Sequence, residues 1–196
     1  MHALALTTSL RSWGSRWLRL ALLDRRGVAA LEFGLIVPLL IGLYVGAVEI
    51  GNLLSIDRRL SEVTSTAADL TAQVQTVSTA DLADITTAAE SIITKSYLTS
   101  MTPPKIVLSS VVADANNTPK VAWSYAVNGA TPRTTNSVVT LPTGLTQASS
   151  SVIMAEVTYA YAPLLTLWGF GSPAPFTISK TFYERPRRSL TVTETN

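Results

Sequence analysis

The sequence predicts an α+β fold with one long N-terminal helix, a second short helix and a small antiparallel β-sheet. The apolar run Val28–Leu54 contains only Glu32 and Glu49 as charges, and beyond it apolar residues recur at helical spacing as far as Val77. After Pro104 the period of the pattern changes to two, which is typical of strands. The composition, with 47% hydrophobic and 14% charged residues, favours a membrane protein over a disordered or ordinary cytosolic one.

Residues 1–27 form a basic leader. They hold five arginines against Asp24, a net charge of +4, whereas the chain from Val28 onward has ten basic and twelve acidic residues, a net charge of −2. The positive-inside rule therefore predicts a cytoplasmic leader, with the bulk of the chain on the other side of the membrane. Because the basic residues are concentrated in the leader, we expect no binding to nucleic acid.

A transmembrane helix is predicted at residues 28–54. The uncharged interval 33–48 would rise about 24 Å, less than the roughly 30 Å of bilayer hydrocarbon, so the span must include Glu32 or Glu49, or both near its edges. An uncompensated carboxylate costs about 2.5 to 3.5 kcal/mol at the centre of an inserted helix. Glu32 is therefore expected to have a partner or a role.

Other residues of the span are candidates for contacts. Gly42 and Gly46, four positions apart, offer a flat face for helix packing, although apolar segments often contain glycine by chance. Pro38 removes a backbone hydrogen bond and could kink the helix. Glu49 is expected at the outer membrane edge, either solvated or in contact with a partner.

The helix is predicted to continue beyond the membrane through residues 55–77, because apolar residues follow a regular 3–4 spacing. These residues are Leu53, Ile56, Leu60, Val63, Ala67, Leu70, Val74 and Val77. They would pack either on the chain's own domain or partly between subunits. The pattern Ser78-Thr79-Ala80-Asp81 is a capping box and predicts the start of the second helix.

Residues 78–196 are predicted to form the outer α+β domain. Its expected parts are a hairpin of strands 105–113 and 121–127, a flexible polar loop at 128–150 with one short strand at 137–141, and strands 151–161 and 175–184. The aromatic residues of these strands are expected in the core or on the sheet faces. The basic cluster at 185–188 is expected to be a solvated strand end or a docking site for an acidic partner or lipid headgroups.

The sequence offers no constellation for catalysis. Cysteine is absent and the only histidine is His2, so the body of the chain lacks the commonest general base and the commonest metal ligands. No glycine-rich phosphate loop, G-x-S-x-G or H-E-x-x-H pattern occurs. We therefore expect neither enzymatic activity nor a cofactor, metal or small-molecule substrate.

The pattern Gly27-Val28-x-x-x-Glu32-Phe33, between a basic stretch and an apolar helix, resembles the processing site of type IV prepilins. The resemblance implies that a prepilin peptidase cuts between Gly27 and Val28, which leaves Glu32 five positions into the mature chain. Cleavage would create an ammonium group on Val28. In a medium of low dielectric constant, Glu32 could pair with that ammonium on a neighbouring subunit and fix the register of an assembly.

The segment EFGLIVPLLIGLYVGAVEIGN, residues 32–52, is similar to the N-terminal helix of the TadE/TadG family, with Pro38, Glu49 and Gly51 at matching positions. The similarity extends to STAADLTAQ, KIVLSSVVADANNTPKVAWS, SVIMAEVTYAYAPLL and TFYERPRR, and the TadE-like type is the closer match. It implies a pilin-like fold and a minor pseudopilin of the tight-adherence (Flp-type) type IV pilus. Such a protein has a periplasmic domain and an inner-membrane helix, works with a prepilin peptidase, an assembly platform and other pilins, and can enter a surface pilus.

Two alternatives use the same apolar segment differently. The run Val45-Gly46-Ala47 fits signal-peptidase cleavage after Ala47, which would release a soluble exported protein. Glu32 inside that segment and the helical pattern beyond Ala47 argue against it. In the other alternative, the chain is an uncleaved single-pass anchor that holds a binding domain, and the spacing from Gly27 to Glu32 is accidental.

Overall fold

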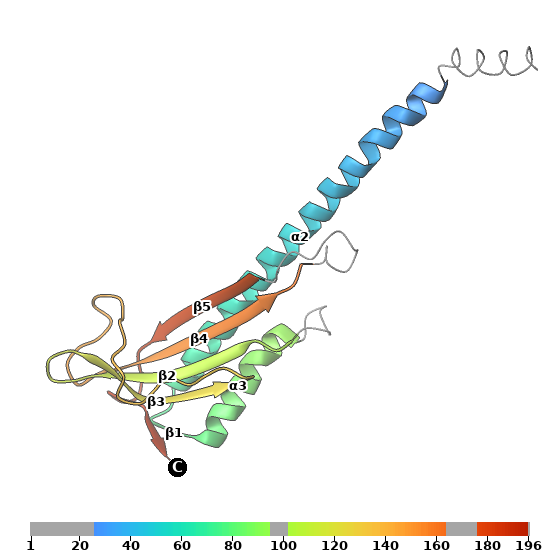
Figure 1. Cartoon of the computed structure of the whole chain (residues 1–196). Helices are drawn as coiled ribbons and strands as arrows, with labels where there is room; N and C mark the ends of the chain where they lie inside the picture. The colour runs from blue at the N-terminus through green and yellow to red at the C-terminus, as the bar shows by residue number, and fades with distance from the viewer. Residues whose placement is uncertain (1–25, 95–101, 164–175, 196) are drawn as a thin grey trace, which may run out of the picture. The chain divides into compact units, whose positions relative to one another are not determined.

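The computed structural model describes residues 26–94, 102–163 and 176–195. Its elements are α2 (Arg26–Ala72), β1 (Thr76–Ser78), α3 (Thr79–Thr94), β2 (Lys105–Ala113), β3 (Pro119–Val127), β4 (Ser151–Tyr161), β5 (Phe176–Glu184) and β6 (Thr193–Thr195) (Figure 1). The α+β fold class is confirmed. The leader arginines before Arg26 lie outside the described residues, and so do residues 95–101, which precede the predicted end of the second helix near Pro103. The chain divides into two compact units, residues 1–48 and residues 49–196.

The first unit is described from Arg26 and consists of the N-terminal half of α2. Pro38 lies inside this helix. By length and composition, Gly27–Ala72 is a helix that could cross a membrane. The helical path and the apolar composition predicted for this segment are therefore both present.

The second unit contains an antiparallel sheet in the order β3-β2-β4-β5. The predicted hairpin is β2–β3, with β3 beginning at Pro119 instead of Val121, and a register shift between Ser110 and Val111 bends the pair. Asp114 closes the connection, since its carboxylate accepts the Thr118 N–H at 2.8 Å. This hydrogen bond lowers the pKa of Asp114.

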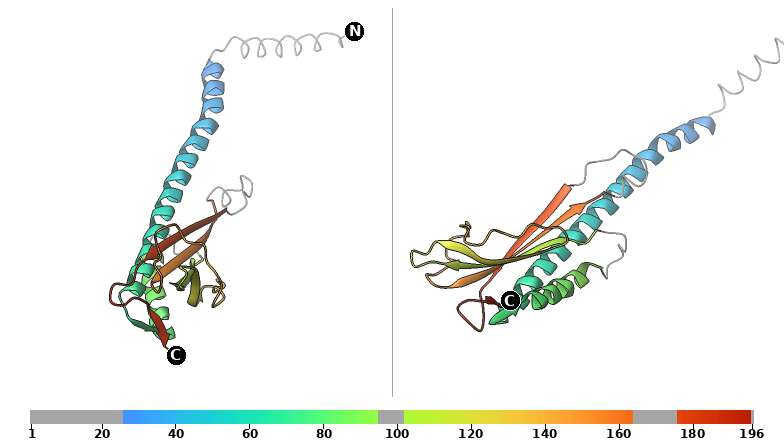
Figure 2. Two further views of the ribbon diagram at one scale, coloured as in Figure 1. Left: turned by 90° about the vertical axis from the view of Figure 1, so that its left-hand side faces the viewer. Right: turned by 60° about the horizontal axis from the view of Figure 1, so that its bottom comes forward.

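Helices α2 and α3 cover one face of this sheet (Figure 2). The core joins the regularly spaced side chains of α2 to α3 and to the sheet; its largest members include Ile56, Leu60, Val63, Leu82, Ile106, Leu108, Ile153 and Tyr161. The regularly spaced side chains from Ile56 to Ala67 therefore pack on the chain's own domain. The buried hydroxyls of Thr64 and Thr71 donate to carbonyls one turn earlier, which satisfies them inside the core.

The predicted continuation of the helix to Val77 is wrong, because α2 ends at Ala72. Residues Thr76–Ser78 instead pair in parallel with Thr193–Thr195, so Val77 is buried from a strand and not from a helix. The Arg187 N–H donates to the Ala72 carbonyl at 3.0 Å, which satisfies one of the open acceptors at the helix end.

The start of the second helix follows the prediction. The Ser78 N–H and hydroxyl donate to the Asp81 carboxylate at 2.9 and 2.7 Å, and the Asp81 N–H donates to the Ser78 hydroxyl at 3.2 Å. This is the reciprocal capping box. The Ser78 N–H lowers the pKa of Asp81, so this capping contribution to stability is present above the ordinary carboxyl pKa and is lost as the pH falls through the lowered value.

The loop at residues 128–150 is attached to β3. Val121 donates its N–H to Ser137 and Val139 donates to Pro119, each at 3.0 Å, and the Val139 side chain is buried on the second face of the sheet. The short strand predicted at 137–141 is reduced to one bridge between Lys120 and Val138. These contacts attach the loop to the sheet. Its predicted flexibility stays a prediction.

The strand aromatics divide between the core and the sheet faces, as predicted. Trp123, Tyr159 and Tyr161 are buried in the core. Phe176 and Phe182 are 43% and 41% exposed on β5, so they are sheet-face residues and not core residues. Both lie on β5, which is an edge strand of the sheet.

Candidate functional site

The processing motif predicted from the sequence lies at the start of α2. The described part of α2 begins at Arg26, and Gly27 and Val28 are the next two residues of the helix. The side chains of Val28, Glu32 and Phe33 are exposed. The peptide bond between Gly27 and Val28 therefore lies at an exposed position of the helix.

The α2 surface in the first unit is apolar and uncovered. The exposed large hydrophobic residues there are Val28, Leu31, Phe33, Leu35, Ile36, Leu39, Leu40, Ile41, Leu43, Tyr44 and Val48. A helix that is apolar on all sides is stable only when lipid or other helices surround it. Within residues 26–48 of the first unit, nothing covers these side chains.

The glycines of this segment make no close contact with their own chain. A Cβ atom added at Gly27, Gly34, Gly42 or Gly46 would meet nothing within 4 Å. The fold of the monomer therefore does not require small residues at these positions. Gly42 and Gly46 remain candidate packing positions for a helix of another subunit.

Glu49 begins the second unit and is held within its own chain. The buried Tyr161, at the end of β4, donates its hydroxyl hydrogen to Glu49 Oε1 at 2.5 Å. Burial raises the pKa of Tyr161 well above its ordinary value, and the Glu49 carboxylate raises it further. The Tyr161 and Phe176 rings lie next to each other, with centroids 5.2 Å apart. The sequence predicted an edge position for Glu49 but gave no local signal for a partner 112 residues away.

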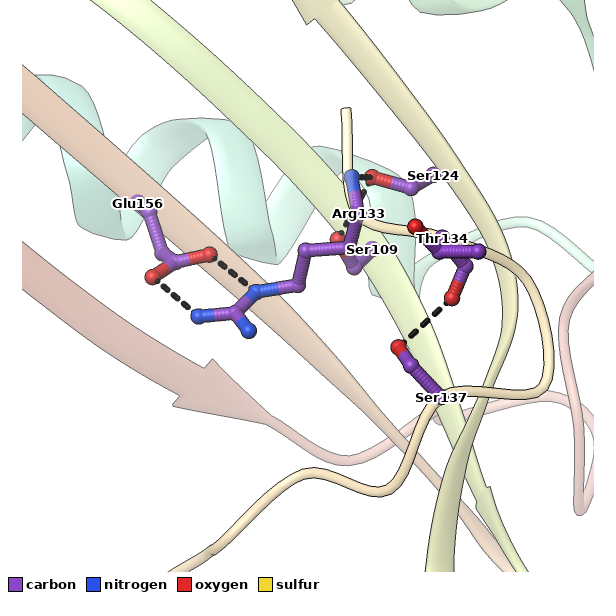
Figure 3. Close-up of polar contacts among 6 residues, drawn as sticks. All are labelled: Ser109, Ser124, Arg133, Thr134, Ser137 and Glu156. Carbon is purple, nitrogen blue, oxygen red and sulfur yellow. Dashed lines mark hydrogen bonds and ion pairs between the residues drawn. The ribbon is translucent and has the colours of Figure 1, made fainter. Parts of the chain in front are cut away.

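A polar cluster on the other face of the sheet holds the loop 128–150 (Figure 3). Arg133 donates from Nε and Nη2 to the two oxygens of Glu156 at 2.6 and 2.7 Å, and its N–H donates to the Ser124 hydroxyl at 2.9 Å. The Ser109 and Ser124 hydroxyls are hydrogen-bonded at 2.9 Å. The bidentate bond to Glu156 raises the pKa of Arg133. The sequence analysis missed this cluster, because nothing local links Arg133 to β4.

The basic segment after β5 docks on its own chain. Arg187 Nη2 lies 2.6 Å from Asp69 Oδ1 on α2, and the Arg185 guanidinium donates to the carbonyls of Gly144 and Leu145. Both arginines are exposed at the end of β5, as expected for a solvated strand end, and they also contact their own chain. Across residues 26–94, 102–163 and 176–195, no group of three or more His, Cys, Asp or Glu side chains could hold a metal ion.

Helix α2 is apolar and uncovered in the first unit, and it carries Gly27 near its start and Glu32 five positions later. Residues 27–69 are TadE-like. They match the family model described as TadE-like protein, and the match lies entirely within α2. Searches of curated proteins and of solved structures gave no match to the chain.

The TadE-like segment contains the candidate residues predicted from the sequence, namely Gly27, Val28, Glu32, Phe33, Gly42, Gly46 and Glu49. It also contains most of the helical face that packs on the sheet. The sheet lies outside the matched residues, as do the Arg133–Glu156 pair and Tyr161. The predicted resemblance is confirmed for the helix, and the similarity of the strand segments stays a prediction.

Proposed function

We propose that the chain is a minor pseudopilin, a structural and non-enzymatic component in the assembly of a tight-adherence (Flp-type) type IV pilus. The TadE-like match supports a component associated with this pilus system. The observation that carries the proposal is the exposed apolar helix that opens on Gly27, Val28 and Glu32. Such a helix needs a bilayer before assembly and neighbouring helices after it.

The proposed topology follows from the charges. The basic leader stays in the cytoplasm, α2 crosses the inner membrane and the sheet domain lies in the periplasm. The partners are a prepilin peptidase, an assembly platform and other pilins or pseudopilins. The peptidase cuts at the cytoplasmic face, between the exposed residues Gly27 and Val28.

Glu32 supplies the charge for assembly in this proposal. Cleavage leaves an ammonium on Val28, and the exposed Glu32 carboxylate of one subunit pairs with the Val28 ammonium of the next. In hydrocarbon an unpaired carboxylate is costly, so the pair favours one axial register over the others. The apolar exposure of Phe33 beside it supports contact with lipid or a neighbouring helix.

N-terminal sequencing with intact-mass measurement of protein from its native membrane fraction tests the processing step. We expect a chain that begins at Val28. A soluble chain that begins at Val48 would instead support cleavage after Ala47 by signal peptidase. A membrane-bound chain that keeps the leader would support an uncleaved anchor and contradict the proposal.

Substitution Glu32→Ala tests the assembly step. We expect normal processing but fewer pili, because a lost charge-assisted contact of about 1.5 to 3 kcal/mol shifts an association equilibrium by roughly ten- to a hundredfold. Electron microscopy and quantification of sheared pili measure this. Glu62→Ala, at an exposed position on the same helix, is the control and should leave pili unchanged. Normal pilus numbers with Glu32→Ala would remove the role assigned to this carboxylate.

A further inference from the structure

The outer domain exposes apolar side chains on the first turns of its own part of α2. Ile50 and Leu54 are 60% and 62% exposed and lie one helical turn apart on the same face. Leu53 and Ile56 point the other way and pack in the core. The next turn brings the charged residue Asp57, so the uncovered face of this helix changes from apolar to charged between Leu54 and Asp57.

Strand β5 changes in the same way. It begins at the half-exposed Phe176, continues with the partly buried Ile178 on the same face, and reaches Lys180 two residues later. Lys180 Nζ lies 2.7 Å from Asp57 Oδ1. The ion pair therefore joins the helix and the strand at the level where each of them becomes charged.

The hydrogen bond between Tyr161 and Glu49 lies on the apolar side of that level. The Phe176 ring packs next to Tyr161, and the Tyr161 hydroxyl donates to Glu49. A carboxylate close to lipid is costly unless it has a hydrogen-bond donor. The end of β4 supplies one at this position, which makes an acidic residue tolerable at the edge of the bilayer.

We propose that Ile50, Leu54 and Phe176 form a basal lipid-contact surface, through which the outer domain rests in the interfacial layer of the membrane. This inference depends on the proposed membrane span. A span of residues 28–54 would rise about 40 Å, which exceeds the roughly 30 Å of hydrocarbon and reaches the headgroup region. Lipid is the occupant because Ile50 and Leu54 directly continue an apolar helix, and the Asp57–Lys180 pair marks the limit of the surface toward water.

The absence of cysteine from the chain makes single-site labelling a direct test. Phe176→Cys and Phe182→Cys are labelled with an environment-sensitive fluorophore in the full-length protein, in liposomes of phosphatidylethanolamine and phosphatidylglycerol that contain nitroxide-labelled lipid. The two positions are matched, since they share a strand, a face and nearly the same exposed fraction. Phe182 lies about 20 Å farther along β5, at about 3.3 Å per residue, beyond the ion pair.

We expect blue-shifted emission and several-fold stronger quenching by the lipid nitroxide at position 176 than at position 182. Equal, weak lipid quenching at both positions would overturn the inference. Protection of position 176 from aqueous iodide without quenching by lipid would also overturn it, in favour of a protein partner. If Phe176→Cys fails to fold, Leu54→Cys reports on the same level from α2.

Leu39→Cys separates failure of this inference from failure of the proposed membrane function. Lipid quenching at position 39 but not at 54 or 176 would leave the span intact and remove the basal surface. The absence of lipid quenching at all three positions would contradict the span itself.

Discussion

Replacement of Gly27 by leucine is expected to abolish removal of the leader, so that the full-length protein accumulates in the membrane. A Cβ atom at Gly27 would meet nothing within 4 Å, so we expect the substitution to leave the helix and the outer domain undisturbed. Leucine has a better helix propensity than glycine and adds bulk next to the scissile bond. Both effects would hinder cleavage, because the proposed peptidase must bind this peptide bond in an extended form within a narrow cleft.

The control for this substitution is Gly34→Leu. Gly34 lies in the same exposed part of α2, and a Cβ atom there also meets nothing within 4 Å. We expect full processing of this variant. Intact mass and N-terminal sequencing distinguish the two forms directly. Processing of Gly27→Leu at the normal site, or equal blocks in both variants, would contradict the assignment of Gly27 to the cleavage site.

Substitution Val192→Asp is expected to destabilise the outer domain by about 3 to 5 kcal/mol, a large share of the 5 to 15 kcal/mol typical of a folded domain. Val192 is 1% exposed and belongs to the core. Its carbonyl accepts the Trp123 Nε1–H at 2.8 Å, which fixes the C-terminal segment against β3. A carboxylate at this position would be buried among the apolar side chains of the core.

Leu190→Asp is the matched control for this prediction. Leu190 lies on the same C-terminal segment but is 76% exposed, so we expect a change within about 0.5 kcal/mol. Urea unfolding of full-length protein in detergent, followed by tryptophan fluorescence, measures both variants. Equal losses of stability in the two variants would show that the segment does not depend on the burial of Val192.

The sequence by itself determined the elements that depend on local patterns. The apolar run and the 3–4 spacing predict α2 because both express the helical repeat within a few turns. The capping box at Ser78 fixed the start of α3, and alternation fixed β2, β4 and β5 within one residue. The motif from Gly27 to Glu32 is local in the same way, since its parts lie within two turns of one helix, and its role as a processing site stays a prediction.

The tertiary structure alone decided features that join distant parts of the chain. The helical pattern continued to Val77, yet α2 stops at Ala72, because the C-terminal strand at Thr193–Thr195 offers Thr76–Ser78 backbone partners. In the same way, β4 provides Tyr161 for Glu49 and Glu156 for Arg133. Such contacts depend on which strands become neighbours in the sheet, and the pattern of a single segment carries no information about its neighbour.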